Sequence, residues 1–217
     1  MKLLDPMGKL IAVTGNTGVG KTSLVQALAQ KGDFGLGIEQ HGNRPFQYLF
    51  KTDPQYALAN QIDYLLLRAE QEQSLRMSPL PGLVDGGLDL DFYMFTRLFH
   101  ARGMLSEPEY DLCARFYQFC RSQLPPPDLI IHITASPEII RQRLAGRERV
   151  NIAGSDDLNL LDSFLDEWLA NLAPEKVIRL DVSNVSPAYS EVIPALRNKI
   201  ISRLGLDAGT YETGYIP

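Results

Sequence analysis

The chain contains 217 residues, of which 45% are hydrophobic and 22% are charged. These proportions are typical of a globular protein and exclude a collagen, a coiled coil or a wholly disordered chain. Because 26 acidic residues outnumber 21 basic ones, the net charge is -5, which argues against a general binder of nucleic acids or of anionic membranes.

Short apolar segments alternate along the chain with longer segments of helical period, which predicts an α/β fold with a parallel sheet. The expected strands, in chain order, are 10–13, 36–38, 83–84, 129–133 and 177–180. The first and fourth are continuously apolar, so we expect the five-stranded sheet to be flanked by helices on both faces. No shift in composition marks a boundary, and we expect one domain across residues 1–217.

The expected helices carry recognisable end signals. Asp53 and Pro54 supply an N-cap and a first-turn proline, and Ser106 and Glu109 have the spacing of a capping box. We expect helices over 21–31, 53–69, 91–102, 106–124, 136–147, 156–172 and 192–204. The second of these should bury one apolar stripe, formed by Ala57, Leu58, Ile62, Leu65, Leu66 and Ala69. The final residues, 205–217, are expected to form a loose tail.

The most specific motif in the chain lies between the first expected strand and the first expected helix. It fits the phosphate-loop pattern G-x-x-x-x-G-K-[ST], in which glycines let backbone N–H groups point at phosphate oxygens. The helix that follows presents its positive end to the same anion. Lys21 would reach the β- and γ-phosphates of ATP, and the Thr22 hydroxyl would ligate Mg²⁺. The expected ATP-binding residues here are Gly15, Asn16, Thr17, Gly18, Val19, Gly20, Lys21, Thr22 and Ser23.

Two carboxylates stand at the carboxyl ends of the second and third expected strands, where open α/β sheets bind their ligands. Glu39 follows the second strand and Asp85 follows the third. Either one alone is often a cap or turn residue. Beside a phosphate loop, the pair suggests Glu39 as a general base and Asp85 as an acid associated with the magnesium ion.

Three arginines lie at the end of the helix expected over 136–147 and just beyond it. Arg143 and Arg147 share one helix face, and Arg149 follows in a segment that turns polar and contains glycine. These features predict an arginine lid over 143–156 that contacts ATP, excludes water and neutralises charge in the transition state. A solvated, charged helix end is the simpler alternative.

Taken in order, the motifs resemble those of the deoxynucleoside kinase family. After its phosphate loop, that family has an E-P pair carrying the catalytic base, then a base-reading Gln with an Arg seven residues later. Glu39 stands at the E-P position, and Gln61 and Arg68 have the seven-residue spacing. Further segments resemble the family's conserved stretches, namely 43–46, the D-R-Y-x-F helix at 91–95, the R-x-x-x-R-x-R lid at 143–149, 158–168 and 178–182. The resemblance implies a P-loop kinase fold.

The resemblance also implies roles for residues of a nucleoside pocket. Gln61 would pair with the base edge, Phe95 would stack on the base, and Asp91 and Arg68 would complete the polar end of the pocket. Phe50 occupies the position at which the family carries a tyrosine for the sugar 3′-hydroxyl. An Asp at position 91 resembles the branch that takes deoxycytidine or purine deoxynucleosides.

The sequence departs from the family pattern on the acceptor side. The family's E-R-S turn reads Asp85-Gly86-Gly87, so the arginine expected at the acceptor hydroxyl is a glycine. The E-P proline is Gln40, and the arginine of D-R-Y is Phe92. Three explanations stay open: another cation substitutes (Arg44, Arg97 or Arg102), the acceptor differs, or activity is weak.

The leading interpretation is an ATP-dependent kinase that uses Mg²⁺ and transfers the γ-phosphate to the 5′-hydroxyl of a (deoxy)nucleoside. The alternatives are a nucleoside monophosphate kinase of thymidylate kinase type and a nucleotide-binding regulator with lost or weak activity. We expect a nucleoside and a nucleoside triphosphate as ligands, and neither nucleic acid nor membrane as partner. The helices that contain Ile62 and Phe95 are apolar enough to pair in a homodimer.

Two cysteines, Cys113 and Cys120, make up neither a disulfide framework nor a zinc site. Their spacing in an expected helix keeps them too far apart to bridge, so we expect two buried thiols in a reducing compartment. No apolar run approaches the ~20 residues that a membrane span needs. The chain is therefore expected to be cytoplasmic.

Overall fold

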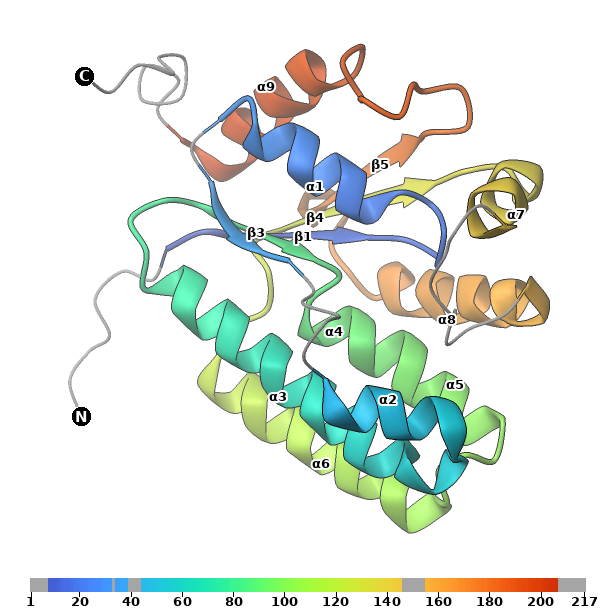
Figure 1. Cartoon of the computed structure of the whole chain (residues 1–217). Helices are drawn as coiled ribbons and strands as arrows, with labels where there is room; N and C mark the ends of the chain where they lie inside the picture. The colour runs from blue at the N-terminus through green and yellow to red at the C-terminus, as the bar shows by residue number, and fades with distance from the viewer. Residues whose placement is uncertain (1–7, 33, 39–43, 146–154, 207–217) are drawn as a thin grey trace, which may run out of the picture.

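The computed structural model describes residues 8–32, 34–38, 44–145 and 155–206. These residues contain a parallel sheet of five strands in the order β2-β3-β1-β4-β5 (Figure 1). The predicted fold class and all five expected strands are confirmed. The strands are β1 (Leu10–Thr14), β2 (Gly35–Gly37), β3 (Gly82–Asp85), β4 (Leu129–Thr134) and β5 (Val177–Asp181).

The central strand β1 lies between β3, which continues to β2, and β4, which continues to β5. Val13 of β1 pairs with Asp85 of β3 on one side and with Ile131 of β4 on the other. Connections from β1 therefore diverge at the carboxyl edge, which is where doubly wound sheets leave a crevice for ligands. The phosphate loop follows β1, and the Asp85 turn follows β3, so the register alone brings these two segments together.

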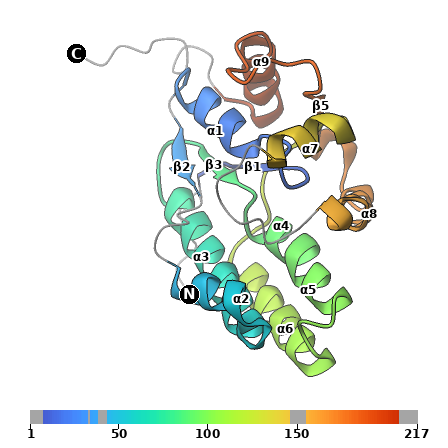
Figure 2. The ribbon, with the colours of Figure 1, turned by 45° about the vertical axis from the view of Figure 1, so that its right-hand side comes forward.

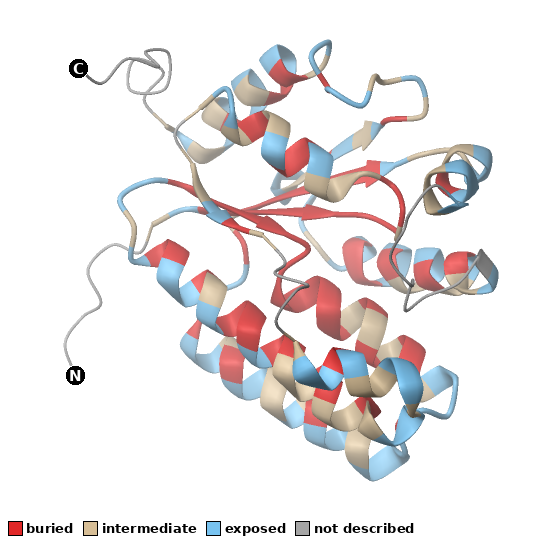
Figure 3. Cartoon of the chain, viewed as in Figure 1, coloured by how far each residue is buried: buried red, intermediate tan, exposed pale blue. Residues whose placement is uncertain are grey.

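Helices cover both faces of the sheet, as the continuously apolar strands predicted. On one face α1 (Lys21–Ala29) and α9 (Ile193–Leu204) pack on Ile11 and Val13. On the other face α3 (Ala57–Arg76), α6 (Glu107–Gln123) and α8 (Leu158–Ala170) pack with Leu10 and Ala12. Because alternate residues of a strand point to opposite faces, β1 contributes to both cores and is buried along its whole length (Figure 3).

The remaining helices lie around the carboxyl edge and below the sheet in Figure 1. They are α2 (Pro45–Thr52), α4 (Leu88–Leu90), α5 (Arg97–Ala101) and α7 (Pro137–Ala145). A single π-helical turn, Asp91–Thr96, joins α4 to α5, and short 3₁₀ turns occupy Pro54–Tyr56, Ser155–Asp157 and Pro174–Lys176. The predicted tail is described only at Gly205 and Leu206, and the rest of it lies outside the described residues.

Several predicted helix ends are confirmed in detail. The backbone N–H of Ser106 donates to Glu109 at 2.7 Å, which completes the capping box that begins α6. Asp53 caps its turn by accepting from the backbone N–H of Gln55 at 2.9 Å. Pro194 lies in the first turn of α9, where its missing N–H costs nothing.

Three predictions about helices need correction. Helix α2 was not expected at all, and the helix expected from residue 91 begins at Leu88 and contains the π turn. Leu66 was placed on the buried stripe of α3, but 45% of its surface is exposed. The buried face of α3 is partly polar, since it includes Gln61, Arg68 and Glu72. A prediction that counts only apolar residues therefore places the centre of the buried face at the wrong angle around the helix.

Cys113 and Cys120 are both buried free thiols, and burial raises the pKa of Cys113 to about 11. Ile62 and Phe95 are half-buried and pack against the core below the sheet. Among the described helices, none has both the length and the apolar character that a membrane crossing requires.

Candidate active site

The phosphate loop joins β1 to α1 through three glycines with positive φ angles. Gly15 has φ 147° and Gly20 has φ 110°, a backbone conformation that other residues rarely adopt. A Cβ at Gly15 would collide with the carbonyl oxygen of Ile133, and a Cβ at Gly20 would collide with the hydroxyl of Tyr189. Both glycines are therefore required by the path of the loop as well as by its phosphate chemistry.

Lys21 is at the first position of α1, where the sequence places it for phosphate binding. Its Nζ donates to the carbonyl oxygens of Gly15 and Asn16, each at 3.0 Å. The ammonium group is thus held over the loop, beside the amino end of a nine-residue helix. An anion bound there meets a side-chain charge and the helix dipole together.

The two helices that flank the predicted lid, α7 and α8, lie on the same side of the molecule (Figure 2), and each makes a hydrogen bond to the phosphate loop. Before the lid, Arg143 of α7 donates from Nη1 to the carbonyl oxygen of Val19 at 2.5 Å. After the lid, the amide Nδ2 of Asn16 donates to the carbonyl oxygen of Leu158 at 2.9 Å and to Asp162 at 2.7 Å. Arg143 therefore lies at the phosphate loop, whereas Arg147 and Arg149 lie outside the described residues.

Tyr189 is a loop contact that the sequence did not predict. It is 2% exposed, and its hydroxyl donates to the carbonyl oxygen of Gly20 at 3.2 Å. Its φ of 57° is the one positive value at a non-glycine residue among the described residues. Strained backbone of this kind persists where the surrounding structure fixes it, which agrees with a role in holding the loop. No local motif marks Tyr189, because the contact depends on a turn far along the chain.

Thr22 and Asp85 meet beside the loop. The Thr22 hydroxyl donates to Oδ2 of Asp85 at 2.5 Å. A hydroxyl from the phosphate loop next to one carboxylate is a donor set that suits Mg²⁺, which takes few protein ligands and completes its shell with phosphate and water oxygens. The described residues contain no cluster of three or more His, Cys, Asp or Glu side chains that would hold a metal ion alone. The arrangement therefore fits a magnesium ion delivered with a nucleotide.

The predicted polar end of the nucleoside pocket is assembled between α3 and the π turn. Nε of Arg68 donates to Oδ2 of Asp91 at 2.6 Å, and both side chains are buried. The amide Nε2 of Gln61 donates to the Thr96 hydroxyl at 2.8 Å and to the Asp91 carbonyl oxygen at 3.2 Å. The structure thus brings Gln61, Arg68 and Asp91 together as predicted and adds Thr96, whose hydroxyl gave no signal in the sequence.

The two aromatic residues expected at the nucleoside lie on the π turn and on α2, elements that both pack against α3. Phe95 is half-buried on the π turn and packs against the core below the sheet. Phe50, on α2, places its ring 5.0 Å from that of Phe99 on α5. Phe50 therefore makes an apolar ring contact at a position where the resemblance led us to expect a tyrosine hydroxyl.

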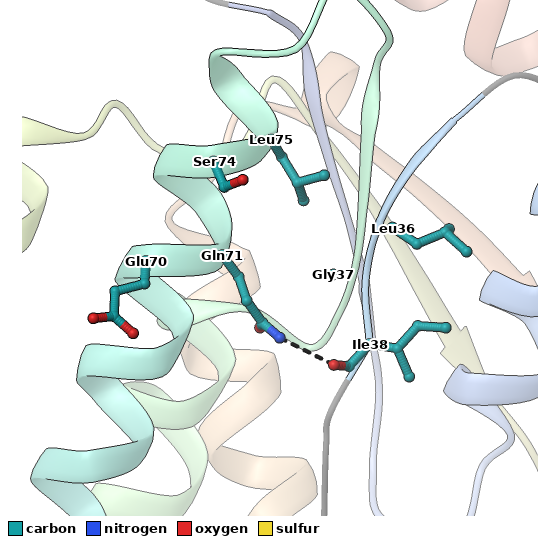
Figure 4. A pocket seen from close by; sticks show the side chains of 7 residues that line it. All are labelled: Leu36, Gly37, Ile38, Glu70, Gln71, Ser74 and Leu75. Carbon is teal, nitrogen blue, oxygen red and sulfur yellow. Dashed lines mark hydrogen bonds between the residues drawn. The ribbon is translucent and has the colours of Figure 1, made fainter.

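Glu39, the expected general base, lies outside the described residues, but its neighbour Ile38 is described. A cavity of about 380 Å³ lies between the end of β2 and α3, lined by Ile38 and by Gln71 among others (Figure 4). The amide of Gln71 crosses it and donates to the Ile38 carbonyl oxygen at 3.0 Å. Oε1 of the same amide accepts from Nη1 of Arg68 at 3.2 Å, so the chain that leaves β2 is tied to the polar cluster.

A buried ionic network lies behind the glycine turn that follows Asp85. Arg121 of α6 donates to both oxygens of Glu72, at 2.7 and 3.1 Å, and to Asp89 at 2.7 Å. Glu72 also accepts from the backbone N–H of Leu88 at 2.9 Å, and Asp89 accepts from the Tyr117 hydroxyl at 2.8 Å. Periodicity could not reveal this network, since Glu72 and Arg121 look like ordinary solvated helix residues.

The three arginines considered as substitutes for the missing acceptor arginine are each paired with an acid. Arg44 contacts Asp63 at 3.0 Å, Arg97 contacts Glu167 at 2.6 Å, and Arg102 contacts Asp157 at 2.5 Å. Arg97 also lies over the ring of Phe164. These partners anchor the three side chains to neighbouring helices.

A phosphate loop at the carboxyl edge of this five-stranded parallel sheet, with a buried polar cluster nearby, is the architecture of a P-loop kinase of the nucleoside and nucleotide kinase type. The comparison with protein families is more specific. The model described as deoxynucleoside kinase matches residues 11–202, and the chain belongs to that family.

Individual relatives agree with this assignment. The chain is 29% identical over 143 residues to the deoxyadenosine kinase of Dictyostelium discoideum. This alignment covers 65% of this chain and 58% of that protein. The chain is 24% identical over 147 residues to the deoxyadenosine/deoxycytidine kinase of Bacillus subtilis, which covers 66% of this chain and 68% of that protein. The first alignment thus spans less than two thirds of the relative's length.

A solved structure resembles the whole fold. The deoxyadenosine kinase of M. mycoides, determined with the products dCMP and a flexible dCDP bound, superposes with a TM-score of 0.74 and 19% identity. The match covers 89% of this chain and 99% of that one. At this identity the likeness supports the fold.

Proposed function

We propose that this member of the deoxynucleoside kinase family transfers the γ-phosphoryl group of ATP to the 5′-hydroxyl of a deoxynucleoside. The observation that carries the proposal is that one turn, after β3, links two parts of a kinase site. On one side Asp85 contacts Thr22 of the phosphate loop at 2.5 Å, and on the other the Arg68–Asp91 pair lies beside Gly86. This proximity supports the assignment of a donor site and an acceptor site to the two sides of the turn.

The donor side of the reaction is assigned to the phosphate loop. Its backbone N–H groups and Lys21 would bind the β- and γ-phosphates, and Thr22 and Asp85 would hold a magnesium ion that neutralises phosphate charge. Arg143, with Arg147 and Arg149, would contact the transferred phosphoryl group and exclude water from it.

The acceptor side is assigned to the buried polar cluster and to the chain that leaves β2. Glu39 would accept the proton of the 5′-hydroxyl while a bond forms between that oxygen and the γ-phosphorus and the bond to the β-phosphate oxygen breaks. A carboxylate of ordinary pKa suits this step, because little basicity is needed in a loose phosphoryl transition state. ADP and a nucleoside 5′-monophosphate are the products.

The base is the part of the substrate that the buried amide and carboxylate would select. Gln61 can donate and accept on a base edge, and Arg68 with Asp91 offers a fixed donor and acceptor beside it. A base with mismatched groups would leave one of these buried polar groups unpaired, which costs affinity. We propose deoxyadenosine and deoxycytidine as the preferred acceptors, because the relatives from Dictyostelium discoideum and Bacillus subtilis are named for these substrates.

The test is an assay of the purified chain with ATP and Mg²⁺ against a panel of deoxynucleosides, ribonucleosides and nucleoside monophosphates. New deoxynucleoside monophosphate is the expected product. Diphosphate formed from a monophosphate would instead support a kinase of thymidylate kinase type. Tight ATP binding without any product would support a regulator, and Asp85→Asn would then alter nucleotide binding alone.

Compartment and assembly are separate parts of the proposal. Two buried free thiols, Cys113 and Cys120, suit a reducing compartment such as the cytoplasm. A homodimer is proposed through the helices below the sheet, and light scattering across a concentration series would decide it.

A further inference from the structure

The turn that follows Asp85 has no side chain with which to contact an acceptor. Gly86 and Gly87 have φ angles of 89° and 85°, which disfavour any other residue. A Cβ at Gly87 would also lie 3.2 Å from Oε1 of Glu72. Phosphoryl transfer nevertheless needs positive charge close to the attacking and transferred oxygens, since negative charge is spread over them in the transition state.

A buried guanidinium lies beside this turn. Nη2 of Arg68 is 3.7 Å from the point that a Cβ on Gly86 would occupy. Arg68 is 3% exposed and comes from the middle of α3, so the charge reaches the turn from a rigid helix. The absence of a side chain at Gly86 leaves this approach open.

Two neighbours fix the orientation of the guanidinium. Asp91 binds Nε at 2.6 Å, and Oε1 of Gln71 accepts from Nη1 at 3.2 Å. The planar group is therefore held at Nε by the π turn and at Nη1 by a neighbouring residue of α3. Such fixed geometry is what electrostatic stabilisation requires, because the donor need not reorganise during the reaction.

The position of the turn relates this charge to the donor site. Gly86 directly follows Asp85, whose carboxylate contacts Thr22, and its backbone N–H donates to the carbonyl oxygen of Val13 at 3.0 Å. The turn is thereby fixed to β1 immediately before the phosphate loop. A group beside Gly86 is thus next to the place where a γ-phosphate held by the loop would meet its acceptor.

We propose that Arg68 supplies the acceptor-side positive charge of this kinase, donating to the 5′-oxygen of the nucleoside and to the transferred phosphoryl group. The inference rests on the proposed function and deepens it. Arg68 keeps its contact with Asp91 at the base end, so one side chain links base recognition to transfer. No proton leaves the guanidinium, and Gln71 acts as a positioning residue by holding its plane.

The experiment compares Arg68→Met and Arg68→Lys with a matched control, Arg76→Lys. Arg76 lies two turns further along α3, is 4% exposed and pairs with Asp128 at 3.0 Å, far from the turn. For each folded variant, kcat and KM are measured with deoxyadenosine and deoxycytidine. Binding of deoxyadenosine and of its 5′-monophosphate is measured by calorimetry in parallel, without ATP.

The expected result for Arg68→Met is a loss of roughly 10²–10³ in kcat at saturating nucleoside for both substrates, the usual effect of removing one charge-stabilising donor. Affinity for the 5′-monophosphate should fall by more than affinity for the nucleoside. Arg68→Lys should recover part of both losses, because the ammonium group restores the positive charge but not the planar set of N–H donors of a guanidinium. Arg76→Lys should lower the unfolding temperature and leave kcat and both affinities unchanged.

Two outcomes would overturn the inference. If Arg68→Met keeps a kcat within about threefold of the wild type and only its nucleoside KM or base preference changes, Arg68 reads the base alone. If the wild-type chain makes no product at all, the proposed function fails. The monophosphate titration then still decides on Arg68, since equal binding by wild type and Arg68→Met contradicts its placement.

Discussion

The hydroxyl of Thr22 and the carboxylate of Asp85, which are 63 residues apart in the chain, form a hydrogen bond of 2.5 Å at the carboxyl edge of the sheet. The contact results from the parallel register of β1 and β3, which places Asp85 opposite Val13. In P-loop kinases a hydroxyl and a carboxylate in these positions share one divalent cation, which is the role proposed above for Thr22 and Asp85.

Asp85→Asn should raise the Mg²⁺ concentration needed for half-maximal activity by roughly 10-fold or more, because an amide cannot supply the negative charge that favours the ion. The measurement is the initial rate across a magnesium series at fixed ATP. Asp128→Asn is the matched control. Asp128 is ion-paired with Arg76 and Lys9 at the other edge of the sheet, so its replacement should affect stability and leave the magnesium curve unchanged.

Lys21→Ala should abolish transfer with little loss of stability. Its Nζ donates to the carbonyl oxygens of Gly15 and Asn16 in the phosphate loop, so the side chain acts at the loop rather than in apolar packing. Activity and thermal unfolding are measured on the same preparation. Lys31→Ala, an exposed lysine just beyond α1, serves as the control and should behave as the wild type. Unfolding of Lys21→Ala at ambient temperature would contradict the assignment.

Much of the fold could be predicted because the signals for it are local. Short apolar runs between helical segments identified all five strands, and the Gly15–Thr22 spacing identified the loop. The polar part of the site was different. Gln61 and Arg68 were placed by resemblance alone, since nothing in periodicity separates a buried helical Arg from a solvated one.

Other contacts could not be predicted because they depend on tertiary packing. Glu72 and Arg121 are 49 residues apart, and only the packing of α3 on α6 joins them. Tyr189 reaches the loop from a turn 169 residues away from Gly20. Helix α2 was missed because it has only eight residues and its one buried side chain is the polar Gln47, which no apolar pattern marks.

Glu39→Gln should lower kcat by ~10²–10⁴ while nucleoside binding survives, because the amide keeps the size and hydrogen bonds of the carboxylate but cannot accept a proton. Single-turnover rates and nucleoside titrations test this together. Glu70→Gln, on α3 beside the end of β2, removes a nearby carboxylate and should leave kcat unchanged. Turnover of Glu39→Gln near the wild-type rate would make Asp85 the better candidate for the base.

The stability of the protein should fall in mild acid through His132. Burial lowers the pKa of His132 from 6.5 to about 4, with Arg179 and Lys21 adding to the effect. Between these two values the unfolded chain binds the proton and the folded chain does not. The free energy of unfolding should therefore decline as the pH falls from about 6.5 to about 4, by something on the order of 3 kcal/mol.

Denaturant unfolding at several pH values measures this slope, and His132→Asn should flatten it. His100→Gln is the control for replacing a histidine outside the core, since His100 is a partly exposed residue of α5. An identical slope in His132→Asn and the wild type would assign the acid sensitivity to carboxylates elsewhere.

Arg121→Met should destabilise the protein by roughly 3–5 kcal/mol, since it leaves the buried carboxylates of Glu72 and Asp89 without their cation. Arg115→Met, an exposed position on the same helix, should change stability by no more than about 0.5 kcal/mol. Adding Glu72→Met to Arg121→Met should recover part of the loss. A stability loss in Arg121→Met no larger than in Arg115→Met would show that the network is not cooperative.

The π turn from Asp91 to Thr96 also sets a limit on how the gene can change. In this turn the Asp91 carbonyl oxygen accepts from the Thr96 hydroxyl and from the Gln61 amide, at 3.3 and 3.2 Å. Deleting one residue would restore an ordinary α-helix and rotate everything before the deletion by about 100° relative to α5. Asp91 would then face away from Arg68. The contact between Asp91 and Arg68 thus fixes the length of this segment. Selection should therefore remove in-frame deletions here, although a surface helix would tolerate them.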